Sequence, residues 1–509
     1  MRMKKLRSAC GDMLGRNYNR VGPSSQFGSS VHVQFVAVSI VVLLFGSSVN
    51  AQLTWRRAYG AFANEDCMAV RVRSDNEFLS VGSTGSFGSG SSDIYLFAVD
   101  GDGVRLWSRT IGGSEIEYAT DMVVAADGSL YVVGSTNEGA GYYNGLALHL
   151  NDQGELLWQR TYGGDDWDFF HSVKLLNNGD LLIAGQSYTG SDLSAEGWLL
   201  HLDQDGEVIW SSTIGGEGDQ VAYSASPTQD GGFVLCGSST TTDRELDAWV
   251  VKYDALGAEE WSGLYGGDSL DIARDIIQTM DGGFSLVGTT RSYASFNEAY
   301  HLKLASDGAQ DWFRNWGQVS DQEAYEHIQI PSGEYLLAGY TTTSGGGGKD
   351  MILQKVGTNG DYIFGRTYGG GGDDSGYSLS ITTTGYLCGG VTDGYGAGGN
   401  DVFLVRSDLE GTTEFQFVST SFDPISVEEL EGERKYPLIH PNPCNGVFSI
   451  RSERSIAHVR VFDGTGRIVL DQAPATGQQE FELDVPAGLY TVLWTDRTGV
   501  LSRAPLVVE

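Results

Sequence analysis

A tryptophan or phenylalanine recurs along this chain every 51 or 52 residues. The eight positions are Trp55, Trp107, Trp158, Trp210, Trp261, Trp312, Phe364 and Phe415. A glycine keeps the same spacing, at Gly82, Gly134, Gly185, Gly237, Gly288, Gly339 and Gly390. Because two residue types share one period, we predict that the chain contains seven copies of a single supersecondary unit.

Each copy has the pattern of a small antiparallel sheet. In residues 271–316, strands are predicted at 272–279, 284–289, 299–304 and 310–315, with turn signals such as Asp281-Gly282 between them. Four short strands cannot bury two faces alone, so the sheets are expected to pack face to face around an axis. The predicted fold class is therefore all-β, with a seven-bladed β-propeller over residues 52–419. A linear solenoid is the alternative, which the absence of helices from the repeat disfavours.

Two segments compete to complete the last sheet of the ring. Residues 53–59 precede the first full copy, and residues 412–418 follow the last, yet both have the pattern of a fourth strand. We favour the N-terminal segment because it keeps Trp55 and Gly60, whereas the C-terminal copy has lost both the tryptophan and the glycine. Such a closure would protect the sheet edges.

The recurring aromatic residues are expected to pack between neighbouring sheets and not to stack on a ligand. Four cysteines remain beyond the leader, at Cys67, Cys236, Cys388 and Cys444, and their spacing fits neither a disulfide framework nor a metal site. Cys236 and Cys388 occupy positions where the other copies have apolar residues, so we expect both to be small core residues.

The first 51 residues have the features of a signal peptide. Six basic residues and one acid occur there, an apolar run covers residues 35–45, and small residues precede a predicted cleavage between Ala51 and Gln52. A membrane anchor is the alternative, although the run is short for a bilayer. The whole chain has a formal net charge of -34. Nucleic acid is therefore not an expected partner.

The repeat resembles the bacterial seven-bladed propeller family often labelled SBBP. The resemblance rests on a tryptophan followed by a Gly-Gly pair, an acid such as Glu117, Asp168, Asp271 or Asp374, and the periodic glycine. Kelch repeats are similar in length and strand order, and Asp254 to Trp261 is similar to the docking motif of quinoprotein propellers. These motifs cover residues 53–419 and imply a fold, not an activity.

The pattern changes after the repeats. Residues 420–435 are acidic and are predicted to be a linker, and residues 436–509 contain short strands expected to form an Ig-like β-sandwich. This tail resembles the C-terminal sorting domain of type IX secretion cargo. The residues that carry the resemblance include Pro441, Asn442, Pro443, Gly446, Gly488 and Tyr490. The chain ends without the usual lysine-rich strand, and an ordinary Ig-like adhesion module is the alternative.

The sorting-domain resemblance implies a route of export. The type IX machinery would be a partner, and the protein would be secreted from, or displayed on the outer membrane of, a Gram-negative bacterium. We also expect a monomer.

Two loop sets that share one face of a propeller vary in this chain: those joining strands two and three and those joining consecutive sheets. Loops on a rigid scaffold often carry binding residues. The candidate ligand-binding residues are Tyr142, Tyr143, Tyr188, Tyr293, Phe296 and Tyr395, which would suit a glycan or protein ligand. These rings could equally cover the ends of the sheets.

Acids after the Gly-Gly pairs, such as Asp165, Asp168 and Asp271, could hold calcium, although no segment has the spacing of a calcium loop. They are more readily explained as acceptors for the amides of the glycine turns. No other cofactor and no metal ligand set is predicted.

No catalytic motif is present: the chain lacks a nucleophile elbow, a zinc-protease helix and a phosphate loop. We therefore predict no catalytic residues and favour a binding scaffold over an enzyme. A propeller glycosidase or lyase is the alternative, because such a site can assemble from several sheets without a local motif.

Overall fold

The computed structural model describes residues 54–413, apart from 139–141, 189–193, 217, 241–245, 318 and 397, together with residues 419–422. In the tail it describes residues 439–440, 447–450, 456–462, 467–474, 480–483, 485–496 and 501–508. The predicted signal peptide with Ala51 and Gln52, most of the predicted linker, and the tail residues Pro441, Asn442, Pro443 and Gly446 lie outside the described residues.

All regular elements in the described residues are β-strands, which confirms the all-β class. None of these residues belongs to a helix that is long and apolar enough to span a membrane.

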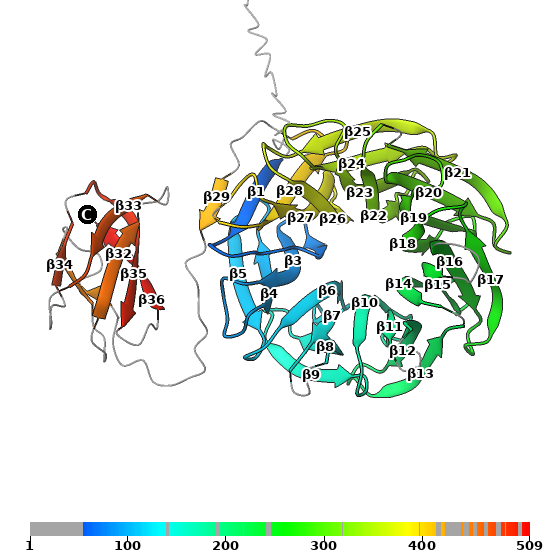
Figure 1. Cartoon of the computed structure of the whole chain (residues 1–509), viewed down its shortest axis with the longest axis horizontal. Helices are drawn as coiled ribbons and strands as arrows, with labels where there is room; N and C mark the ends of the chain where they lie inside the picture. Colours follow the sequence, from blue (N-terminus) through cyan, green and yellow to red (C-terminus); the bar gives the residue numbers. More distant parts are fainter. Residues whose placement is uncertain are drawn as a thin grey trace, which may run out of the picture. The chain divides into compact units, whose positions relative to one another are not determined.

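Seven sheets follow one another along the described residues before the tail and surround a common axis, forming a β-propeller (Figure 1). The first three contain β2 (Ala69–Ser74), β3 (Glu77–Thr84), β4 (Asp93–Val99) and β5 (Arg105–Ile111); β6 (Glu117–Val124), β7 (Leu130–Thr136), β8 (Asn144–Leu150) and β9 (Leu156–Tyr162); and β10 (Asp168–Leu175), β11 (Leu181–Ser187), β12 (Glu196–Leu202) and β13 (Val208–Ile214).

The next three contain β14 (Gln220–Pro227), β15 (Phe233–Thr240), β16 (Leu246–Tyr253) and β17 (Glu259–Tyr265); β18 (Asp271–Gln278), β19 (Phe284–Thr290), β20 (Glu298–Leu304) and β21 (Gln310–Trp316); and β22 (Gln322–Gln329), β23 (Tyr335–Thr341), β24 (Asp350–Val356) and β25 (Tyr362–Tyr368). The last contains β26 (Asp374–Ile381), β27 (Gly385–Thr392), β28 (Asp401–Asp408), β1 (Trp55–Gly60) and β29 (Ser419–Phe422).

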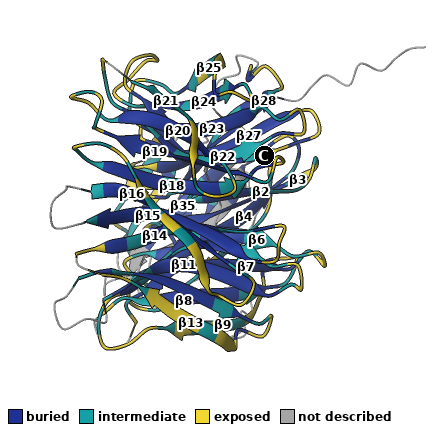
Figure 2. Ribbon diagram, turned by 90° about the vertical axis from the view of Figure 1, so that its right-hand side faces the viewer, coloured by how far each residue is buried: buried dark blue, intermediate teal, exposed yellow. Residues whose placement is uncertain are grey.

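Burial changes from the inner to the outer strands. The middle strands β7 and β11 are almost wholly buried, whereas most residues of the outermost strands β9 and β13 are exposed (Figure 2). The apolar core consists of layers between neighbouring sheets, and one such layer joins Leu96 of β4 to Leu130 of β7. Each sheet is therefore stabilised mainly by its two neighbours.

The periodic glycine is required by a close approach of two backbones. A Cβ atom at Gly288 on β19 would lie 1.9 Å from the carbonyl oxygen of Ile272 on β18. Here the register of β18 shifts between Ala273 and Asp275, which marks a β-bulge. The same contact recurs at Gly134, Gly185, Gly237, Gly339 and Gly390. The periodic glycine thus marks a bulge in six innermost strands: β6, β10, β14, β18, β22 and β26.

The recurring aromatic residues connect each sheet to the next. The indole Nε1 of Trp55 donates to the carbonyl oxygen of Gly101 at 2.9 Å, and Trp261 makes the same bond to Ser306 at 3.1 Å. Four residues along the strand, Tyr59 donates to the carbonyl of Gly103 at 2.6 Å. Equivalent bonds are made by Trp158, Tyr162, Tyr265 and Tyr368. The prediction that these rings pack between sheets is confirmed for the seven that the structure describes, and Phe415 lies outside the described residues.

The N-terminal strand completes the last sheet, as predicted. Strand β1 pairs antiparallel with β28 from Trp55 opposite Arg406 to Tyr59 opposite Val402. On its other side β1 pairs in parallel with β29, which lies beyond the competing segment. That segment overlaps residues 414–418, which are outside the described residues.

Cys67, Cys236 and Cys388 are buried and unbonded to one another, so the two predicted core cysteines are confirmed. Cys444 lies outside the described residues.

The described tail residues form two antiparallel sheets. One contains β30 (Ile439–His440), β31 (Val447–Ile450) and β34 (Glu480–Glu482), and the other contains β33 (Ile468–Gln472), β32 (Ile456–Phe462), β35 (Gly488–Asp496) and β36 (Leu501–Val508). Phe448 and Phe481 from the first sheet and Val461, Val492 and Trp494 from the second belong to one buried apolar cluster. The tail therefore has a core of its own.

Candidate functional site

A small polar cavity lies among the innermost strands of the ring. Its volume is about 80 Å³, and its walls come from β2, β6, β10, β14, β18, β22 and β26 or the residues just before them. On each strand, one residue pairs with the residue that precedes the periodic glycine: Ala69, Asp121, Ser172, Ser224, Asp275, Glu326 and Ser378. We call these seven residues the axial ring. The sequence patterns did not predict this ring.

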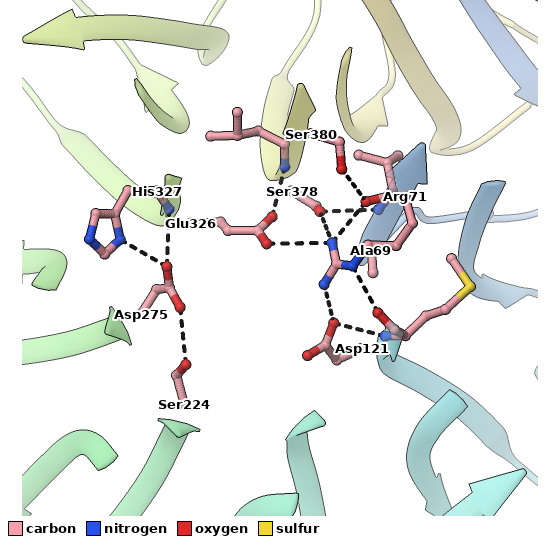
Figure 3. A network of polar contacts seen from close by, with 12 residues as sticks. Ala69, Arg71, Asp121, Ser224, Asp275, Glu326, His327, Ser378 and Ser380 are labelled. Atoms are coloured by element: carbon pink, nitrogen blue, oxygen red, sulfur yellow. Dashed lines mark hydrogen bonds and ion pairs between the residues drawn. The ribbon is translucent and has the colours of Figure 1, made fainter. Parts of the chain in front are cut away.

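Arg71 on β2 carries the central contacts of this cavity (Figure 3). Its Nη2 atom lies 2.6 Å from Oδ1 of Asp121, and its Nη1 atom lies 3.4 Å from Oε1 of Glu326. Asp121 also lies 3.3 Å from Nζ of Lys174. Although burial disfavours its charge, the Asp121 carboxylate raises the pKa of Lys174. Opposite charges therefore compensate one another across the axis.

The acids of the axial ring also bond to the backbone of the next sheet. Asp121 accepts from the amide of Val173, and Glu326 accepts from the amide of Leu379. Burial raises the pKa of Glu326 despite the charge of Arg71. These hydrogen bonds join consecutive innermost strands, so the acids have a structural role that needs no ligand.

Asp275, His327 and Ser285 form a buried chain with the order of a catalytic triad. The Nδ1 atom of His327 lies 2.8 Å from Asp275, and its Nε2 atom lies 3.0 Å from the hydroxyl of Ser285. Burial opposes the charge of Asp275, yet the bonds from His327 outweigh it and lower the pKa of Asp275 to about 2. Ser285 is 0% exposed. A serine in that position cannot reach a substrate, so these three side chains do not form a catalytic site.

A second layer of the cavity is aromatic and basic. The Arg274 guanidinium lies 4.8 Å from the ring centre of Tyr223 and 5.8 Å from that of Tyr325. His171 faces Tyr223 at 5.3 Å between ring centres, and burial lowers the pKa of His171 to about 4. His171 is therefore neutral near pH 7.

Aromatic side chains continue from this layer toward the variable loops. Tyr118 and Phe169 each lie two residues before a wall residue of the cavity, on the side where the chain enters the innermost strand. Tyr143 lies 6.0 Å from Tyr118 and 5.4 Å from Phe169 between ring centres. The ring centre of Trp167 lies 6.4 Å from that of Phe169 and 6.2 Å from that of Tyr188. We call Tyr118, Tyr143, Trp167, Phe169 and Tyr188 the rim cluster.

Trp167 is the exposed member of the rim cluster. Its side chain is 50% exposed, and Tyr142, which precedes Tyr143 in the chain, is 43% exposed. The structure thus brings the predicted residues Tyr143 and Tyr188 together through two residues that the sequence analysis did not select, Trp167 and Phe169. Trp167 could have been found, since it follows a Gly-Gly pair inside a variable loop.

The other predicted residues lie on different sheets. Tyr293 is 56% exposed and packs against Phe313. Tyr395 packs against Phe403, and its hydroxyl donates to the carbonyl of Gly369 at 2.7 Å. Phe296 is 43% exposed. The structure does not bring these three residues into the rim cluster, and their role in binding stays a prediction.

The acids that follow the Gly-Gly pairs bond to glycine amides. The carboxylates of Asp168, Asp271 and Asp374 accept from the second glycine of the pair, at 2.8–2.9 Å. This explanation of the three acids is confirmed. The described residues contain no group of three or more His, Cys, Asp or Glu side chains arranged for a metal ion. These contacts do not test calcium binding.

A comparison with protein families identifies the tail. Residues 438–508 match the model of the secretion system C-terminal sorting domain. The tail is a type IX sorting domain. Within this sorting domain, Tyr490 on β35 is buried, and its hydroxyl donates to the carbonyl of Pro486 at 2.7 Å. Gly488 begins the same strand. The domain indicates export to the cell surface or the extracellular space and contact with the type IX machinery.

No curated protein matches the chain. Several solved structures match the chain at low sequence identity. The extracellular domain of the hybrid two component system BT3049 from B. thetaiotaomicron has a TM-score of 0.41 at 10% identity, covering 89% of this chain, which spans 57% of that one. The β-propeller domain of the Trilobed protease from Pyrococcus furiosus has a TM-score of 0.42 at 10% identity, covering 70% of this chain and 99% of that one. Puromycin hydrolase has a TM-score of 0.43 at 11% identity, and the match covers 86% of this chain and 58% of that one.

Proposed function

We propose that this protein is an exported β-propeller that binds a glycan on its variable-loop face and does not act as an enzyme. The sorting domain supports export, with residues 1–51 as the signal peptide that opens the route. The mature protein would be either released or held at the outer-membrane surface.

The observation that carries the proposal is the rim cluster. Trp167 is half exposed although its ring lies beside those of Phe169 and Tyr188. Large aromatic rings that stay in water beside polar loops are typical of binding surfaces. A flat ring suits the apolar face of a sugar, and the loop hydroxyls and carboxylates suit its hydroxyl groups.

A glycan array with the mature protein tests the proposal. We expect binding by the wild type and a loss of about 30-fold in Trp167→Ala, because a buried aromatic anchor contributes about 2 kcal/mol or more. Leu157→Ala is the matched control, since Leu157 is 57% exposed on the outermost strand of a neighbouring sheet.

A wild type that binds no glycan, or a Trp167→Ala variant that binds as well as the wild type, would contradict the proposal. A glycosidase and lyase panel is run beside the array. Turnover would favour the enzyme alternative, with a site assembled from several sheets. Binding of a protein without any glycan would favour the protein-ligand alternative.

A further inference from the structure

A second hollow opens on the variable-loop side of the ring. It has a volume of about 480 Å³ and lies between the sheet that ends with β21 and the sheet of β22–β25. Trp316 and Val319 form one wall, and Ile352, Gln354 and Gly365 form the other. The volume is within the usual range for small-molecule sites.

Beside the hollow, β24 departs from the repeat at two positions, and the facing residue on β25 is Gly365, which has no side chain. Where β24 has Gln354, the other copies have Phe97, Leu148, Leu200, Val251, Leu302 and Val405. Where β24 has Ile352, five of the other six have a large ring, namely Tyr95, Trp198, Trp249, Tyr300 and Phe403. Gly365 faces Gln354 where Phe313 faces Leu302 in the preceding sheet.

Gln354 is the residue that points to a ligand. Its side chain is 4% exposed, and its amide nitrogen has no hydrogen-bond partner in the structure. Burial of an amide without a hydrogen-bond partner costs free energy, whereas burial of the apolar side chains found in the other copies does not. A ligand oxygen in the hollow would satisfy this donor.

The walls also define the class of ligand. No charged side chain lines the hollow, although the chain carries 66 acids. The polar groups are hydroxyls and amides, among them Thr341, Thr343, Thr367 and Gln322, and they lie beside the rings of Trp316 and Tyr362. Uncharged hydrogen-bonding groups next to aromatic rings suit a neutral, hydroxyl-rich ring.

We propose that this hollow binds one neutral sugar residue, with the Gln354 amide donating to a sugar oxygen and Gly365 leaving the space that the ring occupies. The proposal extends the proposed function, and rests on it for the ligand class, but places the sugar at a site separate from the rim cluster.

Saturation-transfer NMR and calorimetry with D-glucose, D-galactose and N-acetyl-D-glucosamine test the proposal on the mature protein. We expect at least one of these sugars to bind the wild type with millimolar affinity. Gly365→Phe restores the ring that Phe313 supplies in the preceding sheet and should abolish binding. Gln354→Leu, the residue of three other copies, should weaken binding about tenfold through the lost hydrogen bond.

The Gln354→Leu variant remains informative if Gly365→Phe fails to fold. A thermal midpoint of Gln354→Leu equal to or above that of the wild type, together with weaker binding, supports a ligand donor rather than a structural amide. Binding of none of the three sugars, or equal binding by Gln354→Leu and the wild type, would overturn the inference. Trp167→Ala separates the two proposals, because it should leave binding in this hollow unchanged.

Discussion

Replacement of Trp55 by alanine should destabilise the ring more than any equivalent change in another sheet. Trp55 is 4% exposed, whereas the equivalent Trp261 is only partly buried. Truncation of a buried tryptophan costs about 3–5 kcal/mol, and the lost bond to the carbonyl of Gly101 adds about 1 kcal/mol. Trp55 and Tyr59 are the large buried side chains of the closing strand β1. The loss of Trp55 should therefore weaken the pairing that closes the ring.

The expected shift follows from the size of the ring. For about 360 residues, the entropy of unfolding near 60 °C is about 0.75 kcal/mol/K, so a loss of about 5 kcal/mol lowers the thermal midpoint by about 7 °C. Differential scanning calorimetry of the mature protein measures this shift. Trp261→Ala is the matched control, with a shift of about half that size expected because its ring is already partly in water.

An equal shift in both variants would refute the reasoning that closure makes Trp55 special. So would a Trp55→Ala midpoint within about 1 °C of the wild type, because a loss below about 1 kcal/mol cannot be a buried tryptophan. Deletion of residues 52–60 is the stronger form of the experiment, and we expect it to lower the midpoint by many degrees. An unchanged midpoint after deletion would mean that the segment 412–418 replaces β1.

Three further predictions concern acid, calcium and export. The ionised Asp275 stabilises the fold above its ordinary pKa of 3.8, and this contribution of about 2 kcal/mol is lost as the pH falls toward about 2; Asp275→Asn should lose that contribution at pH 7 and flatten the acid limb of the stability curve, and an unchanged limb would contradict it. Millimolar calcium should give no calorimetric heat and no shift of the thermal midpoint, because Asp168, Asp271 and Asp374 already accept glycine amides; measurable heat would indicate an ion site. Truncation after residue 435 should retain the protein inside the cell, as should loss of the type IX translocon, and cell fractionation would expose normal secretion as the contrary result.

The axial ring shows why part of the site escaped prediction. Strict strand alternation sends consecutive residues to opposite faces. The β-bulge in each innermost strand breaks that rule, so that neighbours such as Arg274 and Asp275 both line the cavity. The signal was present, because six of the seven axial-ring residues have a polar side chain. Alignment of the copies at that position would have exposed it.

The rim cluster and the hollow beside Gln354 show a different limit. The sequence analysis placed the candidate aromatic residues in the variable loops, and Tyr143 and Tyr188 do meet there through Phe169 and Trp167. Which loops approach one another is decided by the ring geometry, not by spacing along the chain. Likewise, Gln354 is one polar residue in a strand until the structure shows that its buried amide nitrogen has no hydrogen-bond partner and lies beside the hollow.

The sequence by itself determined the repeat, the order of strands within each sheet, the closing strand and the sorting tail. These features depend on local periodicity, turn glycines and short-range motifs, which are visible in one dimension. Only the tertiary structure decided which side chains face the axis and where one sheet leaves a space against its neighbour. Those features depend on residues about 50 positions apart that meet because the sheets pack in a ring, and small differences between the copies become meaningful only after they are superposed in space.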